Sequence, residues 1–507
     1  MALDANGLRD VVAKHLGARE LVAVSNREPY IHSHAGDGIA CSAPASGLVT
    51  AIESVMRACG GTWVAHGNGD ADRAVVDERD RVLVPPDERR YWLKRVWLGK
   101  AEEEGYYYGV ANGALWPLCH LAHRRPRFDA EQWRAYCQVN RKFADAVLEE
   151  LGTRPAWVFA QDYHFALLPR MLKDARPDLP VAQFWHIPWP HPEVFQICPW
   201  ADEILEGLLG NDLLGFHTTH HCQNFLETAR RAGATVVDAD GDGPVVWWRG
   251  RVTRVRPFPI SVDAAALAQE ATSPGVVATA RRLKRELRLE GQQVALGVDR
   301  IDYTKGIAER FAAVDRFLER YPGYRKRFVL LQVGPLSRIQ IDEYRELNDE
   351  LYRLMIVINR RHGEDSWVPI RILKANHPRT TVLAFFRLAD VCIVGSLHDG
   401  MNLVAKEFVS ARTDGNAALL LSPFAGAAEE LVDAIQANPY DVDAYAEAIR
   451  SCLELPSAER RRRAARLRAA VSGHNIYDWA GDIVTAVGQM CARADGEEAT
   501  GRQMPAA

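Results

Sequence analysis

The chain has 507 residues, with 62 Lys and Arg against 66 Asp and Glu, so its formal net charge at pH 7 is −4. This near balance argues against a nucleic-acid partner, and 48% hydrophobic with 25% charged residues excludes a disordered or collagen-like chain. The length predicts two or three domains. Because no segment has the uncharged apolar length of a membrane span, we expect neither a membrane anchor nor a signal peptide.

The nine cysteines are scattered through the chain without a CxxC pair. Such spacing predicts neither a disulfide framework nor a zinc site, and it favours a reducing, cytoplasmic location. Histidines gather only in the run HTTHHC at 217–222, where adjacent residues on one helix start cannot all point toward one metal ion. We therefore expect no metal site.

The first half of the chain alternates short apolar strands with helical patterns. A strand-like run at 21–25 precedes a helix-spaced segment at 46–58, and the same order returns around the strands at 156–160 and 181–184. Apolar strands that end in polar loops and lead into helices are typical of a parallel sheet covered on both faces.

A second unit of the same kind follows. Residues 262–290 have a charged helical pattern, and the strand-loop-helix order then restarts at 293–298. We predict an α/β fold with an extension at 1–20, doubly wound domains at 21–260 and 261–475, a last helix at 476–495 and a disordered tail at 496–507. Ligands of such sheets bind beyond the carboxyl ends of the strands.

Four cations follow predicted strands directly. They are Arg27, Arg300, Lys305 and Arg338. Guanidinium groups match phosphate oxygens in pairs and an ammonium acts as a point charge, so this distribution favours phosphorylated ligands. The alternative is that each arginine pairs with a nearby carboxylate such as Asp299 or Asp302.

The segment from Asp399 to Glu407 predicts a helix start that can hold a diphosphate. Gly400 permits a tight turn, and amides at 402–404 begin a helix whose positive end attracts phosphate. Each of the two carboxylates would then face one hydroxylated ring. In the alternative, Asp399 caps the helix and Glu407 is a surface residue paired with a cation.

Nine motifs resemble one known family, the trehalose-6-phosphate synthase family of retaining glycosyltransferases, in order from about residue 20 to 485. They are SNREP, ASGL, YYYGVANGALWP, AQDYH, WHIPWPHPEVF, DLLGFHT, VDRIDYTKGI, HDGMNLVAKEF and SPFAGAAEEL. The resemblance implies a GT-B fold, two Rossmann-like domains that face each other across a cleft. The first would bind the acceptor and the second the nucleotide sugar, with the C-terminal helix crossing back to the first.

The resemblance also implies the reaction: glucose passes from a nucleotide diphosphate glucose, UDP-glucose, to glucose 6-phosphate and gives trehalose 6-phosphate. Carried over motif by motif, the acceptor phosphate would contact Arg27, Tyr107, Trp116 and Arg338, and the acceptor hydroxyls would contact Asp162.

The donor side of the resemblance involves mainly the second domain. Arg300 and Lys305 would neutralise the diphosphate, Asp399 would bind glucose hydroxyls and His186 would lie against the transferred glucose. The other implied donor contacts are Gly47, Met401, Asn402, Leu403, Val404 and Glu407. Because two cations and helix amides can stabilise the leaving diphosphate, we expect front-face transfer without a metal or other cofactor.

Two departures from the family pattern and two alternative functions remain open. Ser46 stands where many relatives have glycine, and His398 stands where many have arginine. The same fold could use another phosphorylated acceptor, such as glycerol 3-phosphate or an aminocyclitol phosphate, and a non-catalytic sugar-phosphate sensor could keep the cleft. The complete donor set argues against the sensor. The sequence is also compatible with a homo-oligomer.

Overall fold

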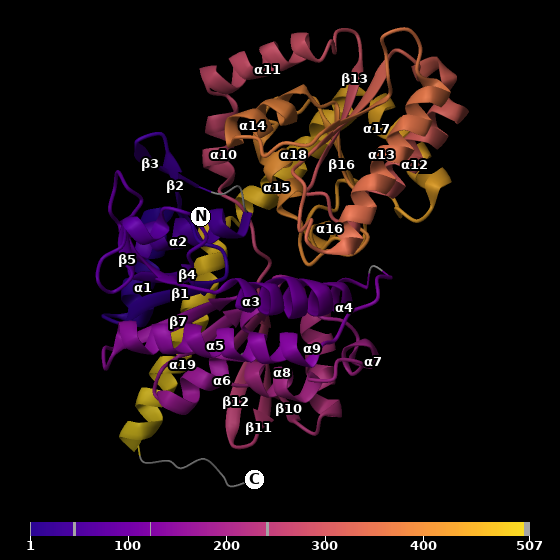
Figure 1. Cartoon of the computed structure of the whole chain (residues 1–507). Helices are drawn as coiled ribbons and strands as arrows, with labels where there is room; N and C mark the ends of the chain where they lie inside the picture. Colours follow the sequence, from indigo (N-terminus) through magenta and orange to yellow (C-terminus); the bar gives the residue numbers. More distant parts are fainter. Residues whose placement is uncertain (1, 44–46, 122, 240–242, 501–507) are drawn as a thin grey trace. The chain divides into compact units, whose positions relative to one another are not determined.

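The computed structural model describes residues 2–43, 47–121, 123–239 and 243–500. The chain forms two compact units (Figure 1). The first contains the residues up to Pro259 together with those from Ile476 onward, and the second contains Ile260–Asn475. Each unit is built around its own sheet.

The sheet of the first unit has ten strands in the order β10-β11-β12-β9-β8-β7-β1-β4-β6-β5. The strands from β12 to β6 run parallel, whereas β10, β11 and β5 pair antiparallel at the two edges. The bounds are Glu20–Ser25 (β1), Thr62–His66 (β4), Arg81–Val84 (β5), Tyr91–Val96 (β6), Ala156–Gln161 (β7), Val181–Phe184 (β8), Leu213–Phe216 (β9), Thr235–Ala239 (β10), Gly243–Trp248 (β11) and Arg251–Pro257 (β12). A separate hairpin joins Ile31–Ala35 (β2) to Gly38–Ser42 (β3).

Helices cover both faces of this sheet. A connection between parallel strands is right-handed, so α2, which leads from β1 to β4, and α5, which leads from β6 back to β7, lie on opposite faces. The helices are Ala5–Leu16 (α1), Gly47–Cys59 (α2), Lys100–Glu103 (α3), Trp116–His120 (α4), Ala130–Leu151 (α5), Leu168–Ala175 (α6), Pro192–Phe195 (α7), Ala201–Leu208 (α8), Thr219–Arg231 (α9) and Ile476–Thr500 (α19), with short turns at Asp72–Ala74 (η1) and Tyr163–Phe165 (η3) and a π-helix at Glu104–Leu115 (η2).

The C-terminal helix α19 packs on the first unit beside α1 and α2. The Trp479 ring lies 5.9 Å from Phe159 of β7 and 5.3 Å from Phe184 of β8. The amide of Leu3 donates to the Asp478 carboxylate at 2.8 Å. Trp479 is completely buried, so the last helix forms part of the core of the first unit.

The helix α19 extends beyond residue 495, where the sequence predicts its end. It runs to Thr500. Residues 501–507 of the expected tail lie outside the described residues.

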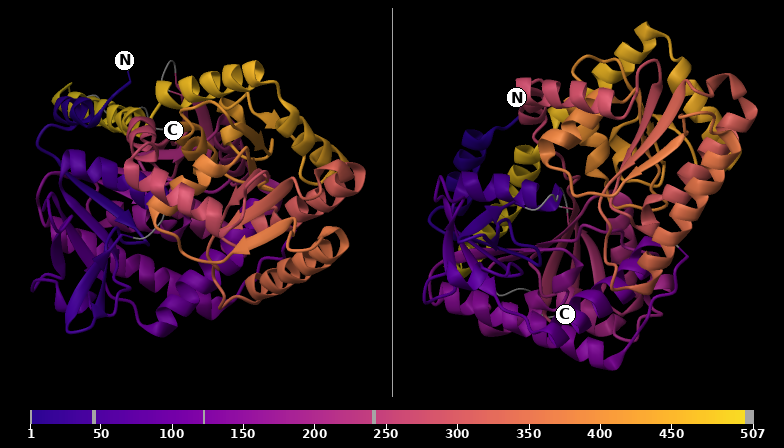
Figure 2. Two further views of the ribbon diagram at one scale, coloured as in Figure 1. Left: turned by 90° about the horizontal axis from the view of Figure 1, so that it is seen from above. Right: turned by 45° about the horizontal axis from the view of Figure 1, so that its top comes forward.

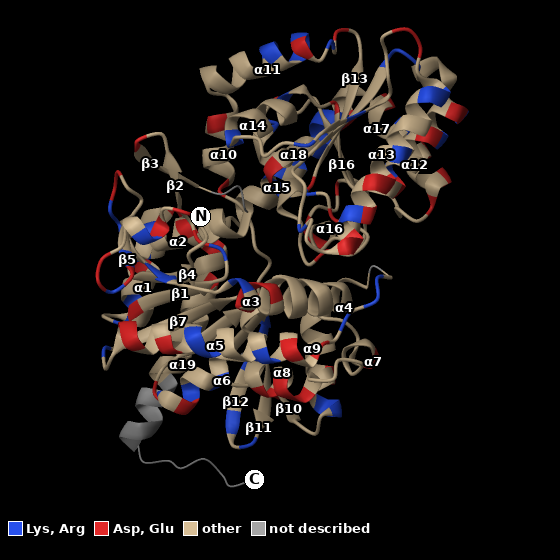
Figure 3. Cartoon of the chain, in the orientation of Figure 1, with Lys and Arg blue, Asp and Glu red and all other residues tan. Residues whose placement is uncertain are grey.

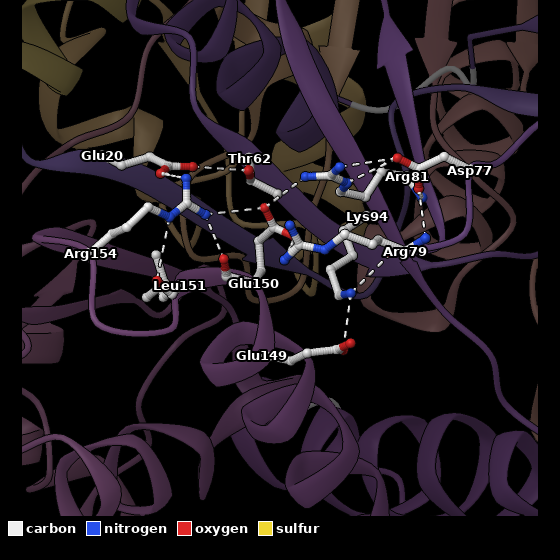
Figure 4. A network of polar contacts seen from close by, with 10 residues as sticks. All are labelled: Glu20, Thr62, Asp77, Arg79, Arg81, Lys94, Glu149, Glu150, Leu151 and Arg154. Carbon is white, nitrogen blue, oxygen red and sulfur yellow. Dashed lines mark hydrogen bonds and ion pairs between the residues drawn. The ribbon is translucent and has the colours of Figure 1, made fainter.

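A buried carboxylate joins α5 to the edge of the first sheet (Figure 4). The Glu150 side chain is 1% exposed, and its oxygens lie 3.3 Å from Arg81, 3.4 Å from Arg79 and 3.3 Å from Arg154. Arg154 also pairs with Glu20 of β1 at 2.6 Å. Because a buried charge is tolerated only when it is paired, these arginines compensate the charge of Glu150 at the end of α5.

The sheet of the second unit has six parallel strands in the order β15-β14-β13-β16-β17-β18. The bounds are Gln293–Val298 (β13), Phe328–Val333 (β14), Ile370–Leu373 (β15), Val391–Val394 (β16), Ala418–Leu421 (β17) and Ile435–Gln436 (β18). Every residue of β14, β16 and β17 is buried, as expected of strands covered on both faces.

The helices of the second unit also divide between two faces (Figures 1 and 2). The chain runs through α12 and α13 in one direction along the sheet and through α14 and α15 in the other, so right-handed connections place the two pairs on opposite faces. The helices are Ala264–Ala271 (α10), Pro274–Glu286 (α11), Ile307–Arg320 (α12), Asp342–His362 (α13), Arg379–Leu388 (α14), Leu403–Ala411 (α15), Ala427–Glu430 (α16), Val442–Glu454 (α17) and Ser457–Gly473 (α18), with short turns at Tyr303–Lys305 (η4) and Pro322–Tyr324 (η5).

Basic and acidic side chains are interspersed along the helices (Figure 3). Arg361 of α13, for example, lies 2.9 Å from Asp315 and 2.8 Å from Glu319, both on α12. None of the helices described here is long and apolar enough to cross a membrane.

Candidate functional site

In each unit the strand order reverses at one place, and several of the sequence-predicted residues follow the strands beside it. The chain leaves β1 toward β4 on one side and later builds β7, β8 and β9 on the other, so the first reversal lies between β1 and β7. In the second unit it lies between β13 and β16. Loops that follow the strands beside such a reversal form the ligand crevice of doubly wound sheets.

The loop after β13 carries Arg300 and Lys305 and turns sharply. The Asp302 carboxylate accepts hydrogen bonds from the amide and the hydroxyl of Thr304, both at 3.1 Å, and so begins the short turn η4. Gly306 then has a φ of 59°, and a Cβ there would lie 2.0 Å from the carbonyl oxygen of Gly395. Only glycine fits at this position, because the loops after β13 and β16 touch there.

The same two loops bring Lys305 and Asp399 together. The Lys305 ammonium lies 2.5 Å from Oδ2 of Asp399, and both side chains are 13% exposed. The same oxygen accepts from Ser396 Oγ at 3.1 Å and from Asn402 Nδ2 at 3.2 Å. Asp399 is therefore held by a cation, a hydroxyl and an amide.

Asp302 is the centre of a second charged group in this unit. Arg338 lies 3.3 Å from Asp302 Oδ2 and 2.5 Å from the Tyr344 hydroxyl. Although burial opposes it, the positive charges of Arg338, Arg300 and Lys305 lower the pKa of the Asp302 carboxyl. The predicted pairing of an arginine with Asp302 is thus present for Arg338, and three predicted cations surround one carboxylate.

The helix α15 begins at Leu403, as the spacing predicts. Asn402 caps it with a φ of 90°, and its side-chain oxygen accepts from the Ala405 amide at 3.2 Å. The amides at 403 and 404 therefore lie in the first turn, where a helix has no carbonyl partner for them and an anion can bind. Met401 is buried at the preceding position.

Glu407 and Lys406 lie one turn further along α15. Burial raises the pKa of Glu407 to about 7, and the charge of Arg379 only partly opposes this. Lys406 is fully buried and donates to Glu430 at 2.6 Å and to the carbonyl of Ile260 at 2.7 Å. Glu407 itself is half-buried rather than fully exposed.

In the first unit, Arg27 lies in an anchored loop after β1. Ser25 Oγ donates to the carbonyl of Arg27 at 2.6 Å, and the amide of Asn68 donates to Glu28 at 3.0 Å. Glu28 is 1% exposed and forms an ion pair with the fully buried Arg95 of β6. The sequence analysis missed this pair, although an arginine inside the apolar strand pattern YWLKRV was a signal for a buried partner.

Asp162, directly after β7, has an unusual backbone that fixes its carboxylate. Its φ is 74°, and its Oδ1 accepts from the amides of Tyr163 at 3.0 Å and His186 at 3.1 Å. Positive φ is uncommon outside glycine, and it also occurs here at Arg338 and Asn402. Such backbone strain concentrates at functional sites.

His186, directly after β8, is held as a neutral ring. Its Nε2 lies 2.9 Å from the Gln161 side-chain oxygen, which makes Nε2 the donor and Nδ1 an acceptor. Burial lowers the pKa of His186 to about 3. Its carbonyl accepts from Nε2 of His217 at 3.1 Å, a structural use of the histidine run at 217–222.

Tyr107 belongs to the π-helix η2, and Trp116 follows at its end. The Tyr107 ring stacks on His164 at 5.8 Å, and the Trp116 ring lies 5.9 Å from Tyr163. Asn112 links η2 to the turn η3. Its Nδ2 donates to the Tyr107 carbonyl at 2.8 Å, and its Oδ1 accepts from the Tyr163 hydroxyl at 2.9 Å. The sequence analysis did not predict this helix.

The π-helix packs against α5 through glycines. A Cβ at Gly105 would lie 2.6 Å from Ala135, and one at Gly109 would lie 2.6 Å from Gln132. π-helices are rare and are frequently found at functional sites. Close packing against α5 explains why this segment cannot carry larger side chains on that side.

The remaining predicted residues divide as follows. Gly47 is the first residue of α2, whereas Ser46 lies outside the described residues. Arg338, expected at the acceptor with Arg27, belongs to the second unit, and Arg27 belongs to the first. Among the side chains that the structure describes, no group of three or more His, Cys, Asp and Glu residues could hold a metal ion.

The comparisons with known proteins agree with the resemblance in the motifs. The model of glycosyltransferase family 20 matches residues 19–489. The trehalose-6-phosphate synthase of Mycobacterium avium is 39% identical over 480 residues, which cover 93% of this chain and 96% of the relative. That of Mycobacterium leprae is 36% identical over 486 residues, which cover 95% and 97%.

Solved structures agree with the fold. An E. coli structure bound with UDP-2-fluoro glucose has 31% sequence identity and a TM-score of 0.82, and covers 93% of this chain and 99% of that chain. An α,α-trehalose-phosphate synthase (UDP-forming) from Burkholderia xenovorans, in complex with glucose-6-phosphate, has 29% identity and a TM-score of 0.83, and covers 92% and 100%. The predicted α/β class, with two Rossmann-like units in a GT-B fold, is confirmed.

Proposed function

This chain belongs to glycosyltransferase family 20, and from that membership we propose that it is a UDP-forming α,α-trehalose-phosphate synthase. It transfers glucose from UDP-glucose to glucose 6-phosphate and gives trehalose 6-phosphate. The observation that carries this conclusion is the likeness over more than nine tenths of the chain to structures bound with a UDP-glucose analogue and with glucose-6-phosphate.

We propose that the second unit binds the donor. The cations Arg300 and Lys305 and the first amides of α15 would hold the diphosphate, and Asp399 would accept hydrogen bonds from hydroxyls of the glucose. Glu407, whose pKa burial raises to about 7, would accept the ribose hydroxyls. The neighbouring contacts would come from Met401 to Val404 and, in the first unit, from Gly47 and His186.

We propose that the first unit supplies most of the acceptor contacts. Arg27, Tyr107 and Trp116, with Arg338 of the second unit, would bind the phosphate of glucose 6-phosphate. Asp162 would accept hydrogen bonds from the hydroxyls of glucose 6-phosphate, because its carboxylate is fixed by two backbone amides at 3.0 and 3.1 Å. The first unit is thus the acceptor domain and the second the nucleotide-sugar domain.

The chemistry needs charge stabilisation at the leaving diphosphate. As the anomeric bond lengthens, negative charge grows on the phosphate oxygen, and fixed cations lower the energy of that state without reorganising. His186 would hold the glucose as a neutral acceptor at Nδ1, since its Nε2 proton faces Gln161. The rest of the rate enhancement would come from binding both substrates through their phosphates, which positions the two sugars.

The test is a matrix of substrates on the purified chain. UDP-, GDP- and ADP-glucose are each combined with glucose 6-phosphate and glycerol 3-phosphate, and nucleotide release, product mass and anomeric configuration are measured. We expect UDP release only with glucose 6-phosphate and a product whose single glycosidic linkage joins two anomeric carbons, both in the α configuration. Turnover with glycerol 3-phosphate instead would establish another acceptor, and folded protein without turnover would favour the sensor.

We further propose that no metal is required and that the protein is cytoplasmic. Metal independence is proposed because Arg300, Lys305 and the first amides of α15 can neutralise the diphosphate. Activity that survives excess EDTA would support it, whereas a loss of activity that Mg²⁺ restores would contradict it. The cytoplasmic location rests on the nine cysteines, which form no disulfide among the described residues.

A further inference from the structure

A single buried arginine lies beneath the loop that carries Arg300 and Lys305. Arg310, on α12, has no exposed surface. Its Nη2 lies 2.9 Å from the Asp299 carboxylate and 3.5 Å from the carbonyl of Lys305. Its Nη1 lies 2.5 Å from the side-chain oxygen of Gln332 on β14. One guanidinium therefore contacts both ends of the loop and the neighbouring strand.

The surrounding backbone makes room for this side chain. A Cβ at Gly297 would lie 2.1 Å from Nη1 of Arg310, so β13 accommodates the guanidinium only because that residue is glycine. At Gly395, after β16, a Cβ would lie 2.2 Å from the Tyr445 hydroxyl and 3.7 Å from Nη2 of Arg310. The strands on both sides of the reversal are thus shaped around Arg310.

Stability alone does not explain a charge in this position. A buried ion pair pays a desolvation penalty that often equals its Coulombic gain, and well-packed apolar residues can replace such a pair without loss. What the ion pair provides is geometry, because the planar guanidinium donates in fixed directions to several partners at once. The partners here are the residue before Arg300 and the backbone of Lys305.

We propose that Arg310 is a positioning residue for the donor diphosphate: it fixes the loop from Asp299 to Gly306 so that Arg300 and Lys305 present their charges at a set separation. The inference rests on the proposed function of these two cations. Arg310 itself is buried beneath the loop and acts through it.

Direct binding of UDP tests the inference without acceptor or turnover. Arg310→Gln and Arg310→Lys are compared with the wild type by calorimetry and thermal unfolding. Arg412→Gln is the matched control, because Arg412 is also a buried arginine of the second unit, paired with Asp414 at 2.9 Å and bonded to the carbonyl of Phe386 at 3.0 Å. None of the described contacts of the Arg412 side chain involves the loop from Asp299 to Gly306.

We expect Arg310→Gln to bind UDP at least tenfold more weakly and Arg310→Lys at least threefold more weakly, while Arg412→Gln stays within twofold at a similar loss of Tm. At saturating donor the KM for glucose 6-phosphate should change less than twofold. Equal UDP affinity of the Arg310 and Arg412 variants would overturn the inference. If Arg310→Gln does not fold, Arg310→Lys decides by the same criterion.

A background without the two cations separates positioning from general destabilisation. In Arg300→Ala/Lys305→Ala, adding Arg310→Gln should weaken UDP binding by less than a further twofold, because there is nothing left to position. A further tenfold loss would overturn the inference. If the folded wild type does not bind UDP, the proposed function falls; if it binds and transfers but the Arg310 variants do the same, only this inference falls.

Discussion

Lys305 and Asp399 are 94 residues apart in the chain, and their charged groups lie 2.5 Å from each other. They meet because β13 and β16 are neighbours in the centre of the second sheet, with Ala295 opposite Val391. The loops that follow these strands therefore share one edge of the sheet. In this arrangement the carboxylate accepts a hydrogen bond from one of the three N–H groups of the ammonium that we assign to the diphosphate, which leaves the other two for phosphate oxygens.

Replacing Lys305 by alanine should mainly slow the chemical step. We expect Lys305→Ala to lower kcat by about 100-fold or more, as loss of one charge-stabilising donor does in other enzymes, with the KM for glucose 6-phosphate within threefold. UDP release at saturating substrates measures this. Lys326→Ala is the control, since Lys326 pairs with Glu364 at 3.1 Å on the surface of the same unit. Equal effects on kcat and on the acceptor's KM would contradict the assigned role.

Replacing Arg338 by alanine should weaken acceptor binding. A charge-assisted hydrogen bond contributes roughly 1.5 to 3 kcal/mol, so we expect the KM for glucose 6-phosphate to rise at least tenfold and that for UDP-glucose to change little. Arg345→Ala removes an exposed arginine of the same unit, paired with Asp342, and should leave both values unchanged. An unaltered acceptor KM in Arg338→Ala would remove this residue from the phosphate site.

Glu407 should make stability fall as the pH rises toward neutrality. Its folded pKa of about 7 lies above the ordinary value of 4.5, so between these values the folded protein binds a proton that the unfolded chain has lost. Stability therefore decreases as the pH rises from 4.5 to 7. Unfolding free energies at pH 5 and pH 8 should show Glu407→Gln gaining up to about 3 kcal/mol relative to the wild type. A constant difference would contradict the shift.

Donor binding should favour the charged form of Glu407, which burial disfavours in the free protein. Ribose hydroxyls donate hydrogen bonds to a carboxylate and so favour its charged form. We expect UDP binding near pH 7 to release a proton in the wild type and none in Glu407→Gln. Calorimetry in two buffers of different ionisation enthalpy measures the difference, and identical proton release by both proteins would exclude the ribose contact.

His186 should make the free energy of unfolding fall as the pH is lowered, whereas Glu407 makes it fall as the pH rises. Because burial lowers its pKa to about 3, the unfolded chain takes up a proton below about 6.5 and the folded protein does not. The wild type should therefore lose about 2 kcal/mol more than His186→Gln between pH 7 and pH 5. Equal losses in urea titrations at the two pH values would show that His186 titrates normally.

The strands and their polar ends were predictable from the sequence because local patterns determine them. The apolar runs before Arg27, Asp162, Arg300 and Asp399 mark buried parallel strands, and a polar residue after such a strand reaches the ligand edge whatever the rest of the chain does. The helix start at Leu403 was predicted as well, but its cap is Asn402 and not Asp399, which the alternative interpretation named.

The parts that were not predicted depend on contacts between distant residues. The π-helix around Tyr107 requires Asn112 to meet Tyr163 and two glycines to meet α5. Arg95 and Arg310 are each 0–2% exposed, yet the sequence does not indicate which carboxylates lie beside them. The order of strands in the sheet determines which cation faces which anion, and that order cannot be read from the linear sequence.

Both ends of the polypeptide are built into the same unit, since Leu3 binds Asp478 and Trp479 completes the core there. The other unit is consequently an uninterrupted insert, joined covalently at only two peptide bonds, 259–260 and 475–476. We therefore expect that a gene segment encoding that insert can be exchanged between relatives as one piece. Such chimeras would exchange the donor contacts that we propose together with Arg338, while Arg27 and Asp162 would remain those of the recipient.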